Sequence, residues 1–172
     1  LGYVGAVIQM ISHAFGSGSL FFAFGLLYLR VHERSMLKLQ GIGEQLPLFS
    51  GFFMLFVFST IGVPFTAGFV GEWMVIVSAI QNTVWIGLLS VLTIVLSAIY
   101  LLSMYRKVFF GQPIAEVALL EDVSWQEIGV LGILTIVILG IGLYPSMLVD
   151  VLAPPVEKLV SASLVSKIGI VS

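Results

Sequence analysis

The sequence predicts an all-α integral membrane protein with four transmembrane helices, the second discontinuous at Pro64, and a short interfacial helix at the carboxyl end. Apolar residues make up 59% of the 172 residues and charged residues only 9%. The mean hydropathy is +1.16, far from the averages of globular proteins. Four apolar runs each hold the 20 or so residues that a transmembrane helix needs. They cover residues 5–29, 46–80, 84–105 and 127–148, so residues 1–150 are assigned to the membrane and 151–172 to a tail.

The composition also excludes several classes of function. The net charge of −2 argues against a nucleic-acid partner. Because the chain has no cysteine, it cannot by itself hold an iron–sulfur cluster or a zinc–thiolate site. The first residue is Leu1 and no basic segment precedes the first apolar run, so we expect no signal peptide. We expect the chain to be the product of a split gene or to begin partway through a longer protein.

The second run is about 35 residues long, which is more than one straight transmembrane helix needs. Pro64 has no N–H to donate to the carbonyl of Thr60, and its ring clashes with that carbonyl. We therefore expect the helix to break between residues 61 and 68, with Gly62, Pro64 and Gly68 as the residues of the break.

The basic residues predict the orientation. They follow the first and third runs, at Arg30, Arg34, Lys38, Arg106 and Lys107, whereas the link 81–83 has none. Basic loops face the cytoplasm or the matrix. We therefore place both loops on that side, and the amino end and the tail on the opposite side.

The tail after residue 155 is amphipathic. Its apolar side chains fall roughly on one helical face, with two lysines off that face: Val156, Leu159, Val160, Leu164 and Ile168, with Lys158 and Lys167. This pattern favours a helix that lies at the membrane interface. The alternative is a frayed end that packs on nothing.

Glu72 is the most informative residue because it lies inside the interrupted run. An ionisable group at that depth costs roughly 2.5–3.5 kcal/mol on insertion scales, and it tends to persist where it has a function. Ion-coupled transporters use helices broken beside a buried charge to expose backbone to a polar path. We interpret Glu72 as a proton-handling residue. The alternative is a structural carboxylate satisfied by a hydroxyl or by a lysine of another helix.

His13 is the second candidate because an imidazole inside a membrane helix suits proton relay near neutral pH. Counted from the outer ends of their runs, His13 and Glu72 both lie roughly 14 Å deep at 1.5 Å per residue. If the two helices pack together, the imidazole and the carboxylate lie at one level. The alternative is a histidine that is hydrogen-bonded to a neighbouring carbonyl.

Weaker candidates for the proton path are hydroxyl residues and a second histidine. In the third run, polar residues recur every three or four positions and so share a helical face: Ser90, Thr93, Ser97, Tyr100 and Ser103. Such a face usually means close helix packing, whereas the functional interpretation is a wire of hydroxyls and water. The residues assigned to a possible path are Ser12, Thr66, Ser97, Tyr100 and His32, although a solvated loop histidine is the simpler interpretation of His32.

Five motifs occur in an order that resembles a known family. They are Ile8-Gln9-Met10-Ile11-Ser12-His13, Leu27-Tyr28-x-Arg30-x-His32-x-Arg34, Gly62-x-Pro64 followed by Gly68-Phe69-Val70-Gly71-Glu72, Tyr105-Arg106-Lys107-Val108-Phe109-Phe110-Gly111 and Tyr144-Pro145. Together they resemble subunit 4 of the proton-pumping NADH–quinone oxidoreductase, respiratory complex I, over residues 1–159. The sequence departs from the family at Phe65, where a small residue usually follows the proline.

The resemblance implies the last four of fourteen transmembrane helices, with Pro64 at the break of the family's second broken helix. It identifies Glu72 as the terminal residue of the proton path toward the outer side, and it places His13 in the central polar axis. It implies no cofactor in this chain, since NADH, FMN, the iron–sulfur clusters and ubiquinone belong to other subunits. The implied partners are lipid, the neighbouring antiporter-like subunits and other membrane-arm subunits, including a polypeptide that supplies the preceding helices.

The expected function is proton translocation in the membrane arm of NADH:ubiquinone reductase, with no redox chemistry in this chain itself. Two alternatives stay open. One is a subunit of a multisubunit cation/proton antiporter, which shares the fold, and the other is a purely structural membrane subunit. The expected location is the mitochondrial inner membrane, with the bacterial plasma membrane as the alternative.

Overall fold

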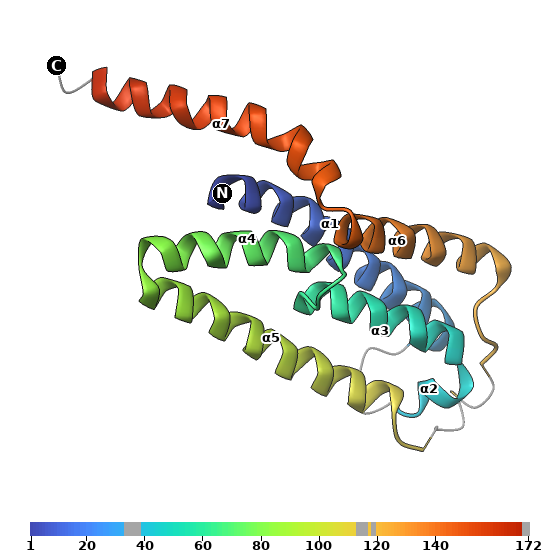
Figure 1. Ribbon diagram of the computed structural model, residues 1–172. Helices are drawn as coiled ribbons and strands as arrows, with labels where there is room; N and C mark the ends of the chain where they lie inside the picture. Colours follow the sequence, from blue (N-terminus) through green and yellow to red (C-terminus); the bar gives the residue numbers. More distant parts are fainter. Residues whose placement is uncertain (33–38, 113–116, 118–119, 170–172) are drawn as a thin grey trace.

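The computed structural model describes residues 1–32, 39–112, 117 and 120–169, and this part of the chain is helical and has no strands (Figure 1). The helices are α1 (Gly2–Val31), α2 (Ile42–Gln45), α3 (Pro47–Ile61), α4 (Ala67–Asn82), α5 (Val84–Phe109), α6 (Trp125–Leu143) and α7 (Ser146–Gly169). Three of them, α1, α5 and α6, are long and apolar enough to cross a membrane, and α3 is a shorter apolar helix. The predicted all-α membrane fold is confirmed.

The helices α3 and α4 follow one another along α1, which runs in the opposite direction (Figure 1). Together they form the expected second span, with its interruption at residues 62–66. α1 contacts α3, α4, α6 and α7, whereas α5 contacts α2, α3 and α4. The pair α3–α4 therefore lies between α1 and α5, and the break is enclosed by helices on more than one side.

Aromatic rings join α1, α3 and α5 at one end of the molecule. The ring of Phe53 lies edge-on to Phe24, with centroids 5.0 Å apart, and 4.8 Å from the ring of Phe109. Tyr105 stacks on Phe109 at 4.3 Å. Phe49 and Phe53 are fully buried. Because aromatic pairs in these geometries add to the free energy of apolar burial, this cluster fixes α3 against α5.

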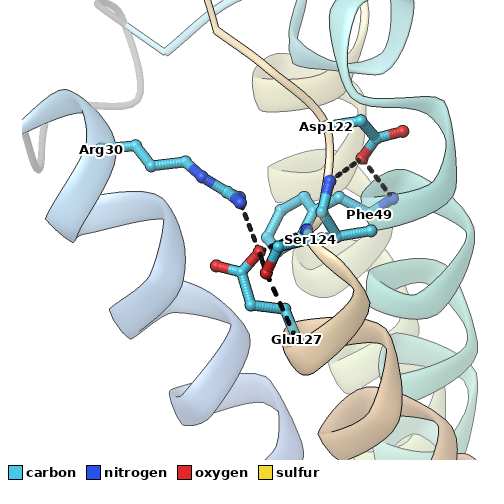
Figure 2. A network of polar contacts seen from close by, with 6 residues as sticks. Arg30, Phe49, Asp122, Ser124 and Glu127 are labelled. Atoms are coloured by element: carbon cyan, nitrogen blue, oxygen red, sulfur yellow. Dashed lines mark hydrogen bonds and ion pairs between the residues drawn. The ribbon is translucent and has the colours of Figure 1, made fainter.

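Polar contacts join α1 to α6 at the same end (Figure 2). Arg30 Nη2 donates to Glu127 Oε2 at 2.7 Å. The same oxygen accepts from the backbone N–H of Ser124 at 2.7 Å, within a capping box that starts α6. Arg30, expected only to set the orientation, thus also holds the first turn of α6 against the last turn of α1.

Asp122 joins the segment before α6 to the first turn of α3 (Figure 2). Its carboxylate accepts from the backbone N–H of Phe49 at 3.2 Å and, on the other oxygen, from that of Leu48 at 2.8 Å. The N-cap residue of α3, Leu46, makes no side-chain capping bond, and Pro47 stands in the first turn. The free N–H groups of a helix start need acceptors, and Asp122 supplies them from 73–74 residues away in the sequence.

The fourth predicted span, 127–148, is divided in the structure. α6 ends at Leu143, and Tyr144 leaves the helix with ψ 63°. The physical reason is Pro145, which has no N–H for the carbonyl of Ile141 and disfavours the helical conformation of the preceding residue. The tail helix α7 accordingly starts at Ser146 rather than at 151.

The first half of α7 packs against α1. Leu148, Leu152 and Val156 lie against a buried cluster that contains Val4 and Ile8. Of the residues after 155 to which the frayed-end alternative applies, Val156 makes such a contact, and the alternative stays open for the rest. The side chains of residues 164–169, including Leu164, Lys167 and Ile168, lie outside the described part, and the interfacial position of the helix stays a prediction.

The carboxyl ends of α1 and α5 lie at the same end of the molecule (Figure 1). The N–H of Gly41, shortly after α1, donates to the carbonyl of Phe110 at 3.3 Å. Arg30 and the pair at 106–107 thus share one end, as the orientation requires. Arg34 and Lys38 lie outside the described residues. The compartment that this end faces stays a prediction.

Removing the Asp122 carboxylate should destabilise the start of α3. We expect Asp122→Ala to lower the free energy of unfolding by about 1–2 kcal/mol, the usual effect of losing a helix cap. Heat- or detergent-induced loss of helical circular dichroism of the purified chain measures this. The neighbouring Glu121→Ala, at an exposed position, is the control, and equal stability of the two variants would contradict the capping role.

Candidate functional site

The break between α3 and α4 is a turn of five residues. Gly62 is left-handed, with φ 82° and ψ 40°, and its N–H and that of Val63 both donate to the carbonyl of Phe58, at 3.1 and 3.0 Å. Phe65 is also left-handed, at φ 73°. For a residue with a side chain, this conformation costs about 1–2 kcal/mol.

Glu72 is the sixth residue of α4, and its side chain points back toward the break. Side chains of a helix tilt toward its amino end, and a Cβ added to Gly62 would collide with Glu72 Oε2. Glu72 Oε1 accepts a hydrogen bond from Gln9 Nε2 at 3.1 Å. Glu72 Oε2 is buried and has no partner among the residues that the structure describes. One oxygen of the carboxylate is therefore held and the other is unsatisfied.

Two glycines allow α1 and α4 to approach closely at this level. A Cβ on Gly71 would lie 2.6 Å from the N, Cα and Oε1 atoms of Gln9, and a Cβ on Gly5 would lie 2.6 Å from the Cβ of Met74. Small residues at helix crossings permit such contact in membranes. The close crossing brings the amide of Gln9 within reach of Glu72.

The carboxylate lines a groove of about 400 Å³ between α1, α4 and α5. We call it the carboxylate groove. Gln9 lies on its α1 side, and the polar face predicted for the third run lies on its α5 side, at Ser90, Thr93 and Ser97. The hydroxyl of Ser90 donates to the carbonyl of Ile86 at 2.9 Å. The structure thus brings Ser97, a predicted path residue, to the same groove as Glu72.

His13 is exposed on α1, one turn beyond Gln9. It lines two further grooves. The first, which we call the imidazole groove, has a volume of about 350 Å³ and is also lined by Gln9, Met10 and Val75. The other, of about 280 Å³, contains Ser17, Thr60 and Tyr100. Ser17 Oγ lies 3.2 Å from His13 Nδ1.

The structure therefore places His13 and Glu72 at neighbouring levels of two packed helices, with Gln9 between them. Gln9, not His13, is the hydrogen-bond partner of Glu72. Sequence reasoning named Gln9 only as part of a motif and gave it no role. Its position four residues before His13 puts both on one helical face, and this spacing was the available signal.

The other predicted residues have different surroundings. Ser12 is buried, and its hydroxyl has no partner among the described residues. Thr66 is buried and donates to the carbonyl of Val63 at 2.7 Å, within the break itself. His32 is exposed at the far end of α1, where its ring lies 6.0 Å from that of Tyr28. A role for any of the three in a proton path stays a prediction.

Across the described ranges, no three or more histidine, aspartate or glutamate side chains gather in a way that could hold a metal ion. The chemistry available in the carboxylate groove is therefore that of a carboxylate, an amide and hydroxyls. Such groups can bind, orient and transfer protons.

Comparison with known proteins shows the family and the fold of the chain. The family model described as "NADH:quinone oxidoreductase/Mrp antiporter, TM" matches residues 1–97. Subunit M of the NADH-quinone oxidoreductase of Rhodobacter capsulatus is 36% identical over 160 residues, which cover 92% of this chain and 31% of that protein. Chain 4 of the NAD(P)H-quinone oxidoreductase of Prochlorococcus marinus (strain NATL1A) is 33% identical over 176 residues, which cover 96% of this chain and 33% of that protein.

The chain spans about a third of the length of the curated relatives that it matches. Among solved structures, a chain of respiratory complex I from Thermus thermophilus with bound NADH superposes with a TM-score of 0.73 at 22% identity. The match covers 90% of this chain and 35% of that chain. This likeness shows a shared fold. The family resemblance predicted from the five motifs is confirmed.

A side chain at residue 62 should disturb both the break and the carboxylate. We expect Gly62→Ala to lower the free energy of unfolding by at least about 1–2 kcal/mol, because alanine is strained at positive φ and its Cβ would displace Glu72 Oε2. Gly51→Ala in α3, where a Cβ meets nothing within 4 Å, is the matched control and should be neutral or stabilising. Unfolding of the purified chain in mild detergent measures both, and a Gly62→Ala variant as stable as the control would show that the break tolerates a side chain.

Proposed function

We propose that this chain, which belongs to the NADH:quinone oxidoreductase/Mrp antiporter transmembrane family, is part of a membrane-arm subunit of a proton-pumping NADH–quinone oxidoreductase and transfers protons through Glu72. Relatives named as subunit M or chain 4 of such enzymes support the assignment. The single observation that supports it most directly is the site of Glu72. It is a carboxylate at the break of a membrane helix, with one oxygen unsatisfied and its side chain on a groove that also holds Gln9 and the hydroxyls of Ser90, Thr93 and Ser97.

The mechanism follows from the cost of charge inside a membrane. An ionised carboxylate there costs roughly 2.5–3.5 kcal/mol on insertion scales, so small changes in its surroundings shift the balance between its protonated and ionised forms. A proton that enters near His13 reaches Glu72 along the imidazole groove, past the side chain of Gln9. Glu72 then releases it through the carboxylate groove toward the outer side, past Ser90, which lies nearer to the link 81–83 than Ser97 does. Tyr100 belongs to the entry side, because it shares a groove with His13.

The driving energy comes from elsewhere in the complex. NADH, FMN, the iron–sulfur clusters and ubiquinone belong to other subunits in this proposal, and this chain performs no redox chemistry. The energy reaches Glu72 as a conformational or electrostatic change along the polar axis. Such a change can open and close polar access most easily where a helix is already interrupted.

The chain requires partners to form a complete proton path. Because it spans about a third of its relatives, the preceding helices come from another polypeptide or from a longer form of this chain. Neighbouring antiporter-like subunits and lipid cover its remaining faces. The chain is a multi-pass membrane protein, and we place it in the mitochondrial inner membrane, with the bacterial plasma membrane as the alternative.

A second candidate function is cation/proton exchange, because the family description includes the Mrp antiporters. In that case membranes that contain the chain would exchange sodium for protons without NADH. Sealed vesicles, a sodium gradient and a pH-sensitive dye separate the two functions. Proton movement that depends on NADH and not on sodium supports the oxidoreductase assignment.

Removing the ionisable group should stop proton transfer at this site. We expect Glu72→Gln to lower proton transfer through this subunit by about 100-fold or more, since a positioned acid–base group contributes 10²–10⁴-fold, while the complex still assembles. The protons moved per NADH oxidised in reconstituted vesicles measure this. Glu157→Gln, on the exposed face of α7, makes the same change outside the groove and should pump normally.

Unchanged pumping by Glu72→Gln would contradict the proposal. If His13→Ala also pumped normally, we would conclude that the polar groups only hydrogen-bond one another. The purely structural alternative would then hold.

A further inference from the structure

Gln9 lies where two grooves meet. It lines the carboxylate groove together with Glu72 and Ser97, and it lines the imidazole groove together with His13 and Met10. Of the predicted site residues, neither His13 nor Glu72 lines both of these grooves. The side-chain amide of Gln9 therefore stands between the two groups that the proposed function connects.

The hydrogen bonds at this point are incomplete in a specific way. Gln9 Nε2 donates to Glu72 Oε1 at 3.1 Å. Gln9 Oε1 and Glu72 Oε2 are both buried and without partners among the described residues. An acceptor oxygen is thus left over on each side chain. Burying a polar atom without a hydrogen bond is unfavourable. Each of these two oxygens is therefore destabilised until a proton or a hydrogen-bond donor reaches it.

A proton on Glu72 would change which partner each group needs. An ionised carboxylate only accepts hydrogen bonds, whereas a protonated carboxyl also has an O–H to donate. The amide of glutamine has both kinds of group, and a half-turn of its terminal torsion, which is roughly two-fold, exchanges the positions of its oxygen and its NH₂ group. In one orientation the amide N–H donates to the carboxylate. In the other, the amide oxygen accepts from the protonated carboxyl.

We propose that Gln9 is a positioning residue that holds Glu72 at the junction of the carboxylate and imidazole grooves in both protonation states, by donating to the carboxylate and accepting from the carboxylic acid. This inference rests on the proposed function and deepens it. Because the amide can adopt either orientation, the Glu72 carboxyl stays hydrogen-bonded to Gln9 both when it takes up the proton and when it releases it. Gly71 leaves the space for it, since a Cβ there would lie 2.6 Å from Gln9 Oε1.

A merely structural role is the competing explanation. Polar side chains often join membrane helices through single hydrogen bonds of modest strength. In that case Gln9 would serve only the crossing of α1 and α4, and an apolar residue of the same length would replace it with little effect on proton transfer. The two explanations therefore differ in what Gln9→Met does to Glu72.

The test uses the complete complex, reconstituted into vesicles, with three single variants. Glu72→Gln identifies the infrared C=O band of the protonated Glu72 carboxyl, as the band that disappears. Gln9→Met removes the amide and keeps the side-chain length. Gln81→Met makes the same change at an exposed position near the end of α4 and serves as the control. For each variant, proton flux during NADH oxidation and the infrared band are measured.

We expect Gln9→Met to assemble, to lower proton flux by about tenfold or more, as loss of a hydrogen bond to a charged group would, and to shift the Glu72 band to higher frequency. Gln81→Met should change neither. Normal flux together with an unshifted band in Gln9→Met would overturn the inference. If Glu72→Gln still abolished pumping in that experiment, the proposed function would stand without the inference.

If Glu72→Gln pumped normally, the proposed function would fail, and the shift of the band in Gln9→Met would alone decide whether the amide holds the carboxyl. Should Gln9→Met not assemble, Gln9→Glu keeps size and polarity but cannot donate when ionised. Two facing carboxyls then share one proton, so flux should fall in assembled complex. Normal flux in Gln9→Glu would overturn the inference.

Discussion

The structure depends on the missing N–H of Pro64. Without it the helix that begins at Pro47 cannot continue, and the chain leaves it through the left-handed Gly62. Because glycine has no side chain, the carboxylate of Glu72 can lie against the main chain at that point. The end of α6 is set at the same level, since Gly142 lies against the main chain of Phe65 and Thr66. One proline thus determines where α4 begins, which residue faces the carboxylate and where the last membrane helix meets the break.

The Glu72 side chain is half-buried, and a hydrogen bond within the described residues compensates only one of its two oxygens. Its insertion costs roughly 2.5–3.5 kcal/mol, and one hydrogen bond to a charged group returns about 1.5–3 kcal/mol. The bond from Gln9 Nε2 therefore offsets much of that cost, but Glu72 Oε2 stays unsatisfied among the described residues. In the proposed function, this oxygen is the place where Glu72 takes up and releases the proton.

Much of the fold could be predicted from the sequence because membrane helices are recognised by length and apolarity. The polar link at 81–83 predicted where α5 begins, and Pro64 predicted the break between α3 and α4. The end of α6 was missed because the apolar run continues through Leu148, although Pro145 was visible in the sequence. The packing of α7 on Val4 and Ile8 could not be predicted, since it depends on contacts between distant segments.

The site was predictable to a lesser degree. The depth of His13 and Glu72 followed from counting residues, but the partner of Glu72 depends on the crossing of α1 and α4, which Gly5 and Gly71 set. No count along one helix reveals that crossing. The Arg30–Glu127 and Asp122 contacts were hidden for the same reason, because they join residues 97 and 73–74 positions apart.

The most direct test of the account is whether Glu72 changes its protonation state while the enzyme works. Infrared difference spectra of the reconstituted complex, recorded with and without NADH turnover in light and heavy water, measure this. The account predicts a carboxyl C=O band that changes on turnover, shifts in heavy water and is absent in Glu72→Gln. Spectra of the native complex and of Glu72→Gln that are identical during turnover would contradict it.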